Sequence, residues 1–355
     1  MWISLLITAA HGWDGNGNDW SYQEDPVEDT FQLNTTSFTD TTGAEVGAAW
    51  ELALWVWNVE AGARLYMPNG GVTDDRTYGG GDNDRNVTMQ ESMHFGSTLA
   101  KARYNSIGDE MTDCDIQMYA ANLNGDITWS YDPDGAPGDA YDFTHTAIHE
   151  LGHCLGLSHS GVDGAIMGST NGRGTGWERR HLQPDDIDGI RALYGEASPE
   201  LAVTTELVDL GNGDGLGQAG EEFELIVSAE NIGDGRAIDV LGVLNGDPVI
   251  ALEVDIGDLG EVLAGASVGS LADALVFSFS VLPECSSQAE AILDFEVSDA
   301  ASEPIEGKVA LALDCGLDAA AEGDDSEEPL ACGCQSGPGP SWIWLLALLA
   351  LRHRS

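Results

Sequence analysis

The sequence has few basic residues. Lys and Arg together number 13 against 61 Asp and Glu in 355 residues, which gives a formal net charge of -48. Nucleic acids and anionic membrane surfaces carry the same sign of charge, so we expect no nucleic-acid partner. Such an acidic exterior suits a protein that works outside the cell. Its carboxylates could also bind Ca²⁺, and the glycine-rich segment from Asp209 to Gly215 is either a calcium loop or a solvated turn.

The sequence also lacks an apolar run long enough to serve as a permanent membrane anchor. The run at residues 342–351 spans ten positions, whereas a membrane-spanning helix needs roughly 17 to 25. Residues 1–10 (MWISLLITAA) are apolar and end in small residues, which is typical of a signal peptide or its remnant. A buried first strand is the alternative for this segment.

Cysteines are few and fall into neighbouring pairs. An even number within each compositional segment favours an oxidising compartment and one possible disulfide in each of two domains, although the sequence does not determine connectivity. Cys154 adjoins a candidate metal ligand, and its position there favours a structural role. The pairs are Cys114 with Cys154, Cys285 with Cys315, and Cys332 with Cys334.

The periodicity of apolar residues divides the chain. Residues 11–197 mix strand-like stretches with helical ones at 45–59 and 144–155, which is an α+β pattern. Residues 198–317 contain repeated short β-type runs separated by turn residues, which predicts an all-β, sandwich-like accessory domain. An acidic linker at 318–331 and a tail at 332–355 follow. The expected strands are 223–229, 237–244, 249–256, 275–282, 291–297 and 309–313.

The strongest chemical signal is the segment HELGHCLGLSH, which runs from His149 to His159. Residues four apart on an α-helix lie on one face about 6 Å apart, so His149 and His153 can present two imidazoles to one metal ion. Glu150 can reach a water molecule at that ion without becoming a ligand. Gly156 lets the chain leave the helix, so that His159 can return as a third ligand. Three nitrogen ligands and one open position are what catalytic zinc requires.

With these residues in place, the region resembles the matrixin branch of the metzincin zinc peptidases. Ser160 is the branch's usual residue after the third ligand, residues 164–167 (GAIM) resemble its methionine turn with Met167 beneath the metal, and residues 183–195 resemble its last helix. The resemblance covers most of residues 11–197. It implies an α+β metzincin-type catalytic domain with a mixed five-stranded sheet, three helices, a flat cleft and an edge strand for the substrate backbone.

The resemblance also implies a function. We expect a zinc-dependent metalloendopeptidase that hydrolyses peptide bonds in extracellular proteins, with one catalytic Zn²⁺, its bound water as the nucleophile and Glu150 as the general base. The expected partner is a protein or peptide substrate. The alternative is a catalytically inert surface adhesion or binding protein that uses the β-sandwich-like domain, although the intact Glu150 counts against it. The sequence does not indicate the oligomeric state.

The C-terminal residues carry a second resemblance. Cys332-Gly-Cys334 precedes a short spacer, the apolar run at 342–351 and a terminal pair of arginines. This order resembles the myxobacterial-type (MYXO-CTERM-like) C-terminal sorting signal, in which the cysteine is the point of processing and surface attachment. We therefore expect a secreted protein that is attached to the outer cell surface, with transient membrane or cell-surface attachment through residues 332–355.

Overall fold

A computed structural model gives the fold of the chain. It describes residues 15, 17, 20, 30–78, 86–168, 176–263, 267–268, 274–283, 285 and 289–315. The expected signal segment, acidic linker and C-terminal tail, including Cys332 and Cys334, lie outside the described residues. The domain boundaries expected at 197/198 and 317/318 stay predictions. No helix in the described part of the chain combines the length and apolar character needed to cross a membrane.

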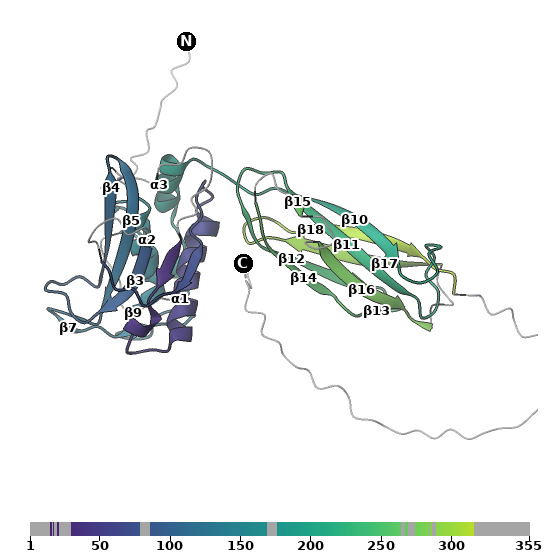
Figure 1. Ribbon diagram of the computed structural model, residues 1–355, viewed down its shortest axis with the longest axis horizontal. Coiled ribbons are helices and arrows are strands. Elements are labelled where there is room, and N and C mark those ends of the chain that lie inside the picture. The colour runs from purple at the N-terminus through teal and green to yellow at the C-terminus, as the bar shows by residue number, and fades with distance from the viewer. Residues whose placement is uncertain are drawn as a thin grey trace, which may run out of the picture. The chain divides into compact units, whose positions relative to one another are not determined.

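The N-terminal part is built on a mixed five-stranded sheet with the strand order β2-β1-β3-β5-β4. Figure 1 labels strands β3, β4 and β5 of this sheet. The first four of these strands run parallel, and β4 alone pairs antiparallel with its neighbour β5. This arrangement confirms the α+β class expected from the sequence. It also leaves β4 at an edge of the sheet. The strands are β1 (Phe31–Leu33), β2 (Asn69–Val72), β3 (Asn86–Glu91), β4 (Ala100–Ile107) and β5 (Glu110–Tyr119).

Three α-helices accompany this sheet: α1 (Gly43–Glu60), α2 (Phe143–Cys154) and α3 (Pro184–Tyr194). A capping box starts α1, in which the Thr42 hydroxyl accepts from the Glu45 N–H and the Glu45 carboxylate accepts from the Thr42 N–H. The face of α1 with helical apolar spacing is buried, as that spacing predicts. Trp57 on this face donates its indole N–H to the Ile148 carbonyl oxygen of α2 over 2.8 Å. Helix α1 therefore packs against α2 and is hydrogen-bonded to its backbone through Trp57.

Helix α2 is buried along almost its whole length and is fixed at its start by a charged contact. The Asp142 carboxylate accepts the His145 N–H as the helix cap and pairs with the Arg180 guanidinium, with Nε and Oδ2 2.9 Å apart and both side chains at most 4% exposed. Arg180 also donates to the carbonyl oxygens of Asp132 and Pro133. Asp142 and Arg180 are thus paired with each other and hydrogen-bonded to the backbone, so neither charge is left without a partner in the interior.

Short elements complete this part of the chain. The pairs β6 (Ala121–Asn122) with β7 (Gly125–Asp126) and β8 (Trp129–Ser130) with β9 (Tyr141–Asp142) form two small sheets. Two 3₁₀-helices, η1 (Thr35–Ser37) and η2 (Trp177–Arg180), flank α1 and α3 on their N-terminal sides. The β8–β9 pair positions the start of α2, because β9 leads directly into that helix.

The chain from residue 201 to 312 is all β, with two sheets around a separate apolar core. One sheet has the order β10-β11-β16-β13, with β15 added to β11, and the other has the order β14-β12-β17-β18. The core-facing residues of β16 alternate strictly with outward ones, as a half-buried strand requires. The strands are β10 (Leu201–Asp209), β11 (Glu222–Asn231), β12 (Ala237–Gly246), β13 (Ile250–Leu252), β14 (Ile256–Val262), β15 (Ser267–Val268), β16 (Leu275–Val281), β17 (Glu290–Ser298) and β18 (Ile305–Ala312).

The prediction of one strand, at residues 249–256, was wrong. The apolar run 249–256 is not a single strand but ends β13 at Leu252 and begins β14 at Ile256, in different sheets. Between them the N–H groups of Glu253 and Val254 both donate to the Ser278 carbonyl oxygen of β16, and the Asp255 carbonyl oxygen accepts from Leu244 of β12. The chain thus crosses from one sheet to the other within three residues.

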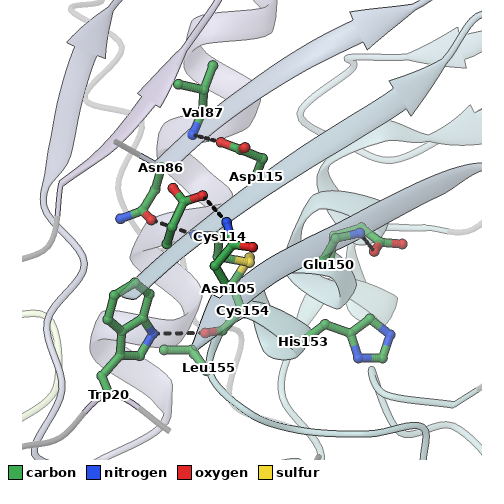
Figure 2. The surroundings of a disulfide bond; sticks show 12 residues. Trp20, Asn86, Val87, Asn105, Cys114, Asp115, Glu150, His153, Cys154 and Leu155 are labelled. Atoms are coloured by element: carbon green, nitrogen blue, oxygen red, sulfur yellow. Dashed lines mark hydrogen bonds between the residues drawn. A yellow bond between two sulfur atoms is a disulfide. The ribbon is translucent and has the colours of Figure 1, made fainter. Parts of the chain in front are cut away.

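Both described pairs of cysteines are disulfide-bonded: Cys114 with Cys154, and Cys285 with Cys315. The first bond joins β5 to the last residue of α2, and Trp20 donates its indole N–H to the Cys154 carbonyl oxygen over 2.9 Å at the same point (Figure 2). Cys154 is therefore a structural residue in this fold and not a metal ligand. The end of α2 is tied to the sheet by a covalent bond.

We predict that Cys114→Ala/Cys154→Ala lowers the free energy of unfolding by about 2 to 4 kcal/mol, because the bond closes a loop of tens of residues. Seven of the ten tryptophans lie in residues 11–197 and none in residues 198–317, with the others at positions 2, 342 and 344, so the main change of tryptophan fluorescence in urea follows the N-terminal part. The matched control is Cys285→Ala/Cys315→Ala, which should leave this fluorescence transition unchanged. Ready alkylation of Cys114 and Cys154 in the unreduced, denatured protein would contradict the prediction.

Candidate metal centre

Three histidines from two adjacent segments converge. Helix α2 supplies His149 and His153, and the chain beyond it supplies His159; one ring nitrogen from each lies within 4.8 Å of the others. The ring centroids are 4.8, 5.2 and 4.9 Å apart for the pairs 149–153, 149–159 and 153–159. In the described part of the chain no other three His, Cys, Asp or Glu residues meet in this way. The sequence-predicted ligands are therefore brought together.

Carbonyl oxygens orient two of these imidazoles. His149 Nδ1 lies 2.7 Å from the Ile166 carbonyl oxygen, and His153 Nδ1 lies 2.7 Å from the Leu157 carbonyl oxygen. A carbonyl oxygen can only accept, so Nδ1 carries the hydrogen in both rings and Nε2 keeps its lone pair. This is the tautomer that a metal ligand needs, because Nε2 is then free to bind the ion. The hydrogen bond from Nδ1 to the carbonyl oxygen also fixes the orientation of each ring.

The turn after α2 explains how His159 returns. Gly156 has φ 93°, a left-handed conformation that suits glycine at a helix C-terminus. The Gly156 N–H donates to the His153 carbonyl oxygen and the Leu157 N–H to that of Gly152. These bonds close the helix and reverse the chain, so that Leu157 meets the His153 ring and His159 follows two residues later.

Met167, predicted to lie beneath the metal, is 1% exposed and packs against α2 at Gly152. A Cβ atom added to Gly152 would lie 2.3 Å from the Met167 sulfur and 2.9 Å from the Trp57 ring. The position between the two histidines of α2 therefore has room for glycine only, because any larger residue would displace the methionine or the helix.

Two aspartates at the start of α3 hold this methionine turn, and sequence reasoning missed them. The Asp186 carboxylate accepts the N–H groups of Ile166 and Met167 at 2.9 and 3.0 Å. The Asp185 carboxylate accepts from the Ser160 hydroxyl at 2.6 Å. Asp186 is 1% exposed, and a buried carboxylate that receives backbone N–H groups fixes their positions. The signal available in the sequence was a polar pair at a helix start, which also fits ordinary capping.

Glu150 is buried beside the histidines, at 5% exposure. Its Oε2 accepts the Ala102 N–H of β4 over 2.7 Å. Burial raises the pKa of Glu150 to about 7, and the hydrogen bond from Ala102 opposes that shift. A carboxyl group with a pKa near neutrality can both take up and release a proton at physiological pH. Sequence reasoning found Glu150 but could not find Ala102, because a backbone N–H leaves no trace in the residue type.

Burial also keeps the histidines neutral. The pKa of His149 falls to about 3, mainly through burial and then through the neighbouring charge of His153. The pKa of His153 is lowered for the same first reason. Neutral imidazole is the form that binds a metal ion, so the fold favours the ligand state over the protonated state.

An open cleft of about 960 Å³ leads to these groups. Its walls include residues of β4 and the rings of His94, Tyr104 and Tyr141. The His94 ring lies 4.7 Å from the Tyr119 ring. His145, one turn before His149, is instead packed in the interior with Nδ1 2.7 Å from the Arg179 carbonyl oxygen. The cleft residues that reach the centre are His149, Glu150, His153 and His159.

The segment considered as a calcium loop has its own hydrogen bonds. The Asp209 carboxylate accepts the N–H groups of Gly211 and Gly215 at 2.8 and 2.9 Å. These bonds lower the pKa of Asp209, with the bond from Gly215 contributing most. Such bonds are what a self-contained turn makes. Calcium binding here stays a prediction.

The sheet, the helices and the convergent histidines form an α+β domain with a candidate metal centre. Residues 20–195, just under half of the chain, match the matrixin family, so this part of the chain is similar to matrixin metallopeptidases. Stromelysin-1 of Mus musculus is 40% identical over 85 residues, which cover 23% of this chain and 17% of that protein. Metalloendoproteinase 2-MMP of Arabidopsis thaliana is 46% identical over 66 residues, or 19% and 17% of the two chains.

Matrilysin of Homo sapiens is 40% identical over 78 residues, which cover 21% of this chain and 29% of that protein. The chain thus spans less than a third of the length of each of these relatives. A solved structure of Escherichia coli alpha-2-macroglobulin is 15% identical over 32% of this chain and 17% of that chain, with a TM-score of 0.25. That likeness is too slight to carry an argument.

We predict that His153→Ala lowers the zinc content of the purified protein from about one ion per chain to well below that, since two nitrogen ligands bind zinc far more weakly than three. Elemental analysis by mass spectrometry measures it. His94→Ala removes a histidine from the same cleft and should keep the full zinc content. Equal zinc in His153→Ala and the parent protein would contradict the assignment.

A second prediction concerns the metal-free protein. Because the pKa of His149 is lowered from 6.5 to about 3 on folding, the unfolded chain binds more protons than the folded one between these values. The contribution of His149 to the free energy of unfolding should therefore fall as the pH decreases below 6.5, whereas Glu150, whose pKa is raised on folding, contributes in the opposite direction. Urea unfolding of EDTA-treated protein between pH 6.5 and 5, above the ordinary pKa of carboxyl groups, measures the slope. The slope should be smaller in His149→Gln, and an unchanged slope would count against burial of a neutral His149.

Proposed function

We propose that the chain is a zinc-dependent metalloendopeptidase that hydrolyses peptide bonds in extracellular proteins. The observation that carries this proposal is the position of Glu150, a buried carboxyl group next to three convergent imidazoles at the inner end of an open cleft. A site that only stored zinc would need no acid–base group and no access for a large ligand. The match to the matrixin family supports the same conclusion.

The residues fit a zinc ion. Three neutral nitrogen donors, two of them with Nδ1 bonded to carbonyl oxygens, are the donor set of catalytic zinc and leave a fourth position open. When bound, zinc lowers the pKa of a water molecule and polarises the carbonyl group of a substrate. His149, His153 and His159 would hold the ion, and the Met167 turn would keep their platform in place.

Glu150 would move the proton. With a pKa raised to about 7, it can take a proton from the attacking water and deliver it to the leaving nitrogen of the peptide. The Ala102 N–H keeps the carboxylate aimed from the side of β4. Proton transfer of this kind contributes about 10²- to 10⁴-fold to a rate.

Strand β4 would bind the substrate backbone. It is an edge strand, and an extended peptide can extend a sheet by pairing with such an edge. Because the Ala102 N–H points away from β5 and toward Glu150, the outward backbone groups of β4 lie at the reaction centre. A peptide paired there would pass across the three histidines, which fits an endopeptidase that cleaves within a chain.

The setting of this activity is also part of the proposal. The acidic composition, the cysteine pairs and the signal-like and sorting-like ends of the sequence support secretion and attachment to the outer cell surface. The substrate would then be an extracellular protein or peptide. An inert adhesion protein is the alternative, and it requires that the chain bind partners without cleaving them.

We predict that Glu150→Gln lowers kcat/KM on peptide substrates by about 10²- to 10⁴-fold while zinc content stays unchanged. The parent chain, loaded with zinc, is first tested on a mixed peptide library to find a cleaved bond. Glu178→Gln removes an exposed carboxylate elsewhere in the same region and should leave activity intact. The enzyme proposal fails if the zinc-loaded parent cleaves nothing, or cleaves no faster than Glu150→Gln.

A further inference from the structure

The cleft contains one lysine, Lys101, that forms no ion pair with any residue in the described part of the chain. Lys101 lies in β4, is exposed, and lines the cleft beside Glu150. It is one of only two lysines in a chain with 61 acidic residues. The other lysine, Lys308, pairs with Asp294 over 2.6 Å. Lys101 has no carboxylate partner among the residues that the structure describes, in a chain with a formal net charge of -48.

The register of β4 shows why Lys101 is unpaired. Arg103, two residues along and on the same face of the strand, lies opposite Asp115 of β5, whereas Lys101 lies opposite the uncharged Gln117. The Arg103 guanidinium also lies 5.9 Å from the centre of the Tyr78 ring. Arg103 thus has a carboxylate residue across the strand pair and an aromatic ring nearby, whereas the residue across from Lys101, which lines the cleft, is uncharged.

The pleat of β4 places this charge next to a bound peptide. Ala100 and Ala102 turn their side chains toward the apolar core under α2, so Lys101 between them points to the opposite face. A peptide that pairs with the free edge of β4 continues the same pleat. Its residue opposite Lys101 therefore has its side chain on the lysine's face, with Cβ atoms about 5 Å apart.

We infer that Lys101 selects substrates with an acidic side chain at the position opposite it, next to the scissile bond. This inference rests on the proposed peptidase function and names its substrate class. The net charge of the protein repels acidic peptides in general, so a local cation is needed if such a residue is to be accepted near Glu150. Opposite charges directly across two strands attract, and like charges repel.

The simpler explanation is that Lys101 only protects an edge strand from pairing with other chains, a common role for lysine. The two explanations differ in their consequences for substrates. Protection of the edge requires a charge but no preference among substrates, whereas selection requires that one substrate position respond to the sign of the charge at residue 101.

The experiment uses the full-length, zinc-loaded protein and a peptide with a mapped cleavage site. Asn and Asp are compared one at a time at each of the three positions on either side of the scissile bond, at an ionic strength of about 10 mM, where charges are weakly screened. We expect one position at which Asp raises kcat/KM over Asn by about 1.5- to 5-fold. An Asp placed at the far end of the peptide measures the general repulsion.

Substitutions at residue 101 decide the matter. The preference for Asp should vanish in Lys101→Gln and become a preference for Asn in Lys101→Glu, and it should weaken at about 0.5 M salt. Lys308→Gln changes the net charge equally, far along the chain, and should keep the preference. An Asp-to-Asn ratio that is the same in the parent and in Lys101→Gln at every position would overturn this inference while leaving the peptidase proposal intact. The absence of any cleavage by the parent would overturn both.

Discussion

The chemistry of the metal centre depends on the burial of α2. This single helix carries two of the proposed ligands and the proposed general base within five residues, so any movement of the helix would move all three groups together. Its start is held by the Asp142–Arg180 pair and its end by the Cys114–Cys154 bond. Its middle packs on Trp57 and Met167 through the gap left by Gly152. A helix fixed at both ends and on one face can present side chains with little loss of entropy when a metal or substrate binds.

The same burial tunes the acid–base groups in opposite directions. Removal from water disfavours the charged form of every group, which lowers the pKa of His149 and raises that of Glu150. Neutral imidazoles and a carboxyl group that titrates near neutrality are both what a zinc hydrolase needs. The surrounding acidic surface does not produce this effect, because exposed charges are screened by salt within about a Debye length. The interior of the fold, and not the surface charge, therefore sets the protonation states of these groups.

The sequence predicted those parts of the site that depend on local spacing. The interval between His149 and His153 and the glycine before His159 follow from helix geometry alone, so the ligands and Glu150 could be named without a structure. The apolar face of α1 was equally visible as a helical repeat. Two contacts could not be predicted: the one between the Ala102 N–H and Glu150, and the one between Asp186 and the N–H groups of Ile166 and Met167. Each joins a carboxylate to backbone N–H groups that are distant in the sequence. The run 249–256 failed for a similar reason: its apolar pattern continues while hydrogen bonds from β16 and β12 break it into two strands. Strand β10 was missed because its residues do not alternate between buried and exposed.

Strand β4 depends both on local sequence and on contacts between distant segments. Its identity as an edge strand is a property of the whole sheet, yet the residues it offers at that edge are fixed one by one in the sequence. Ala102 turns its N–H to Glu150 because the strand's pleat and its pairing with β5 leave that group no other partner in the ladder. The same pleat places Lys101 on the open side, where its charge meets no carboxylate among the described residues. The N–H group that orients the Glu150 carboxylate and a cation with no carboxylate partner among the described residues thus belong to neighbouring residues of one strand. Orientation of the proposed base and the proposed recognition of the substrate therefore depend on the same backbone register.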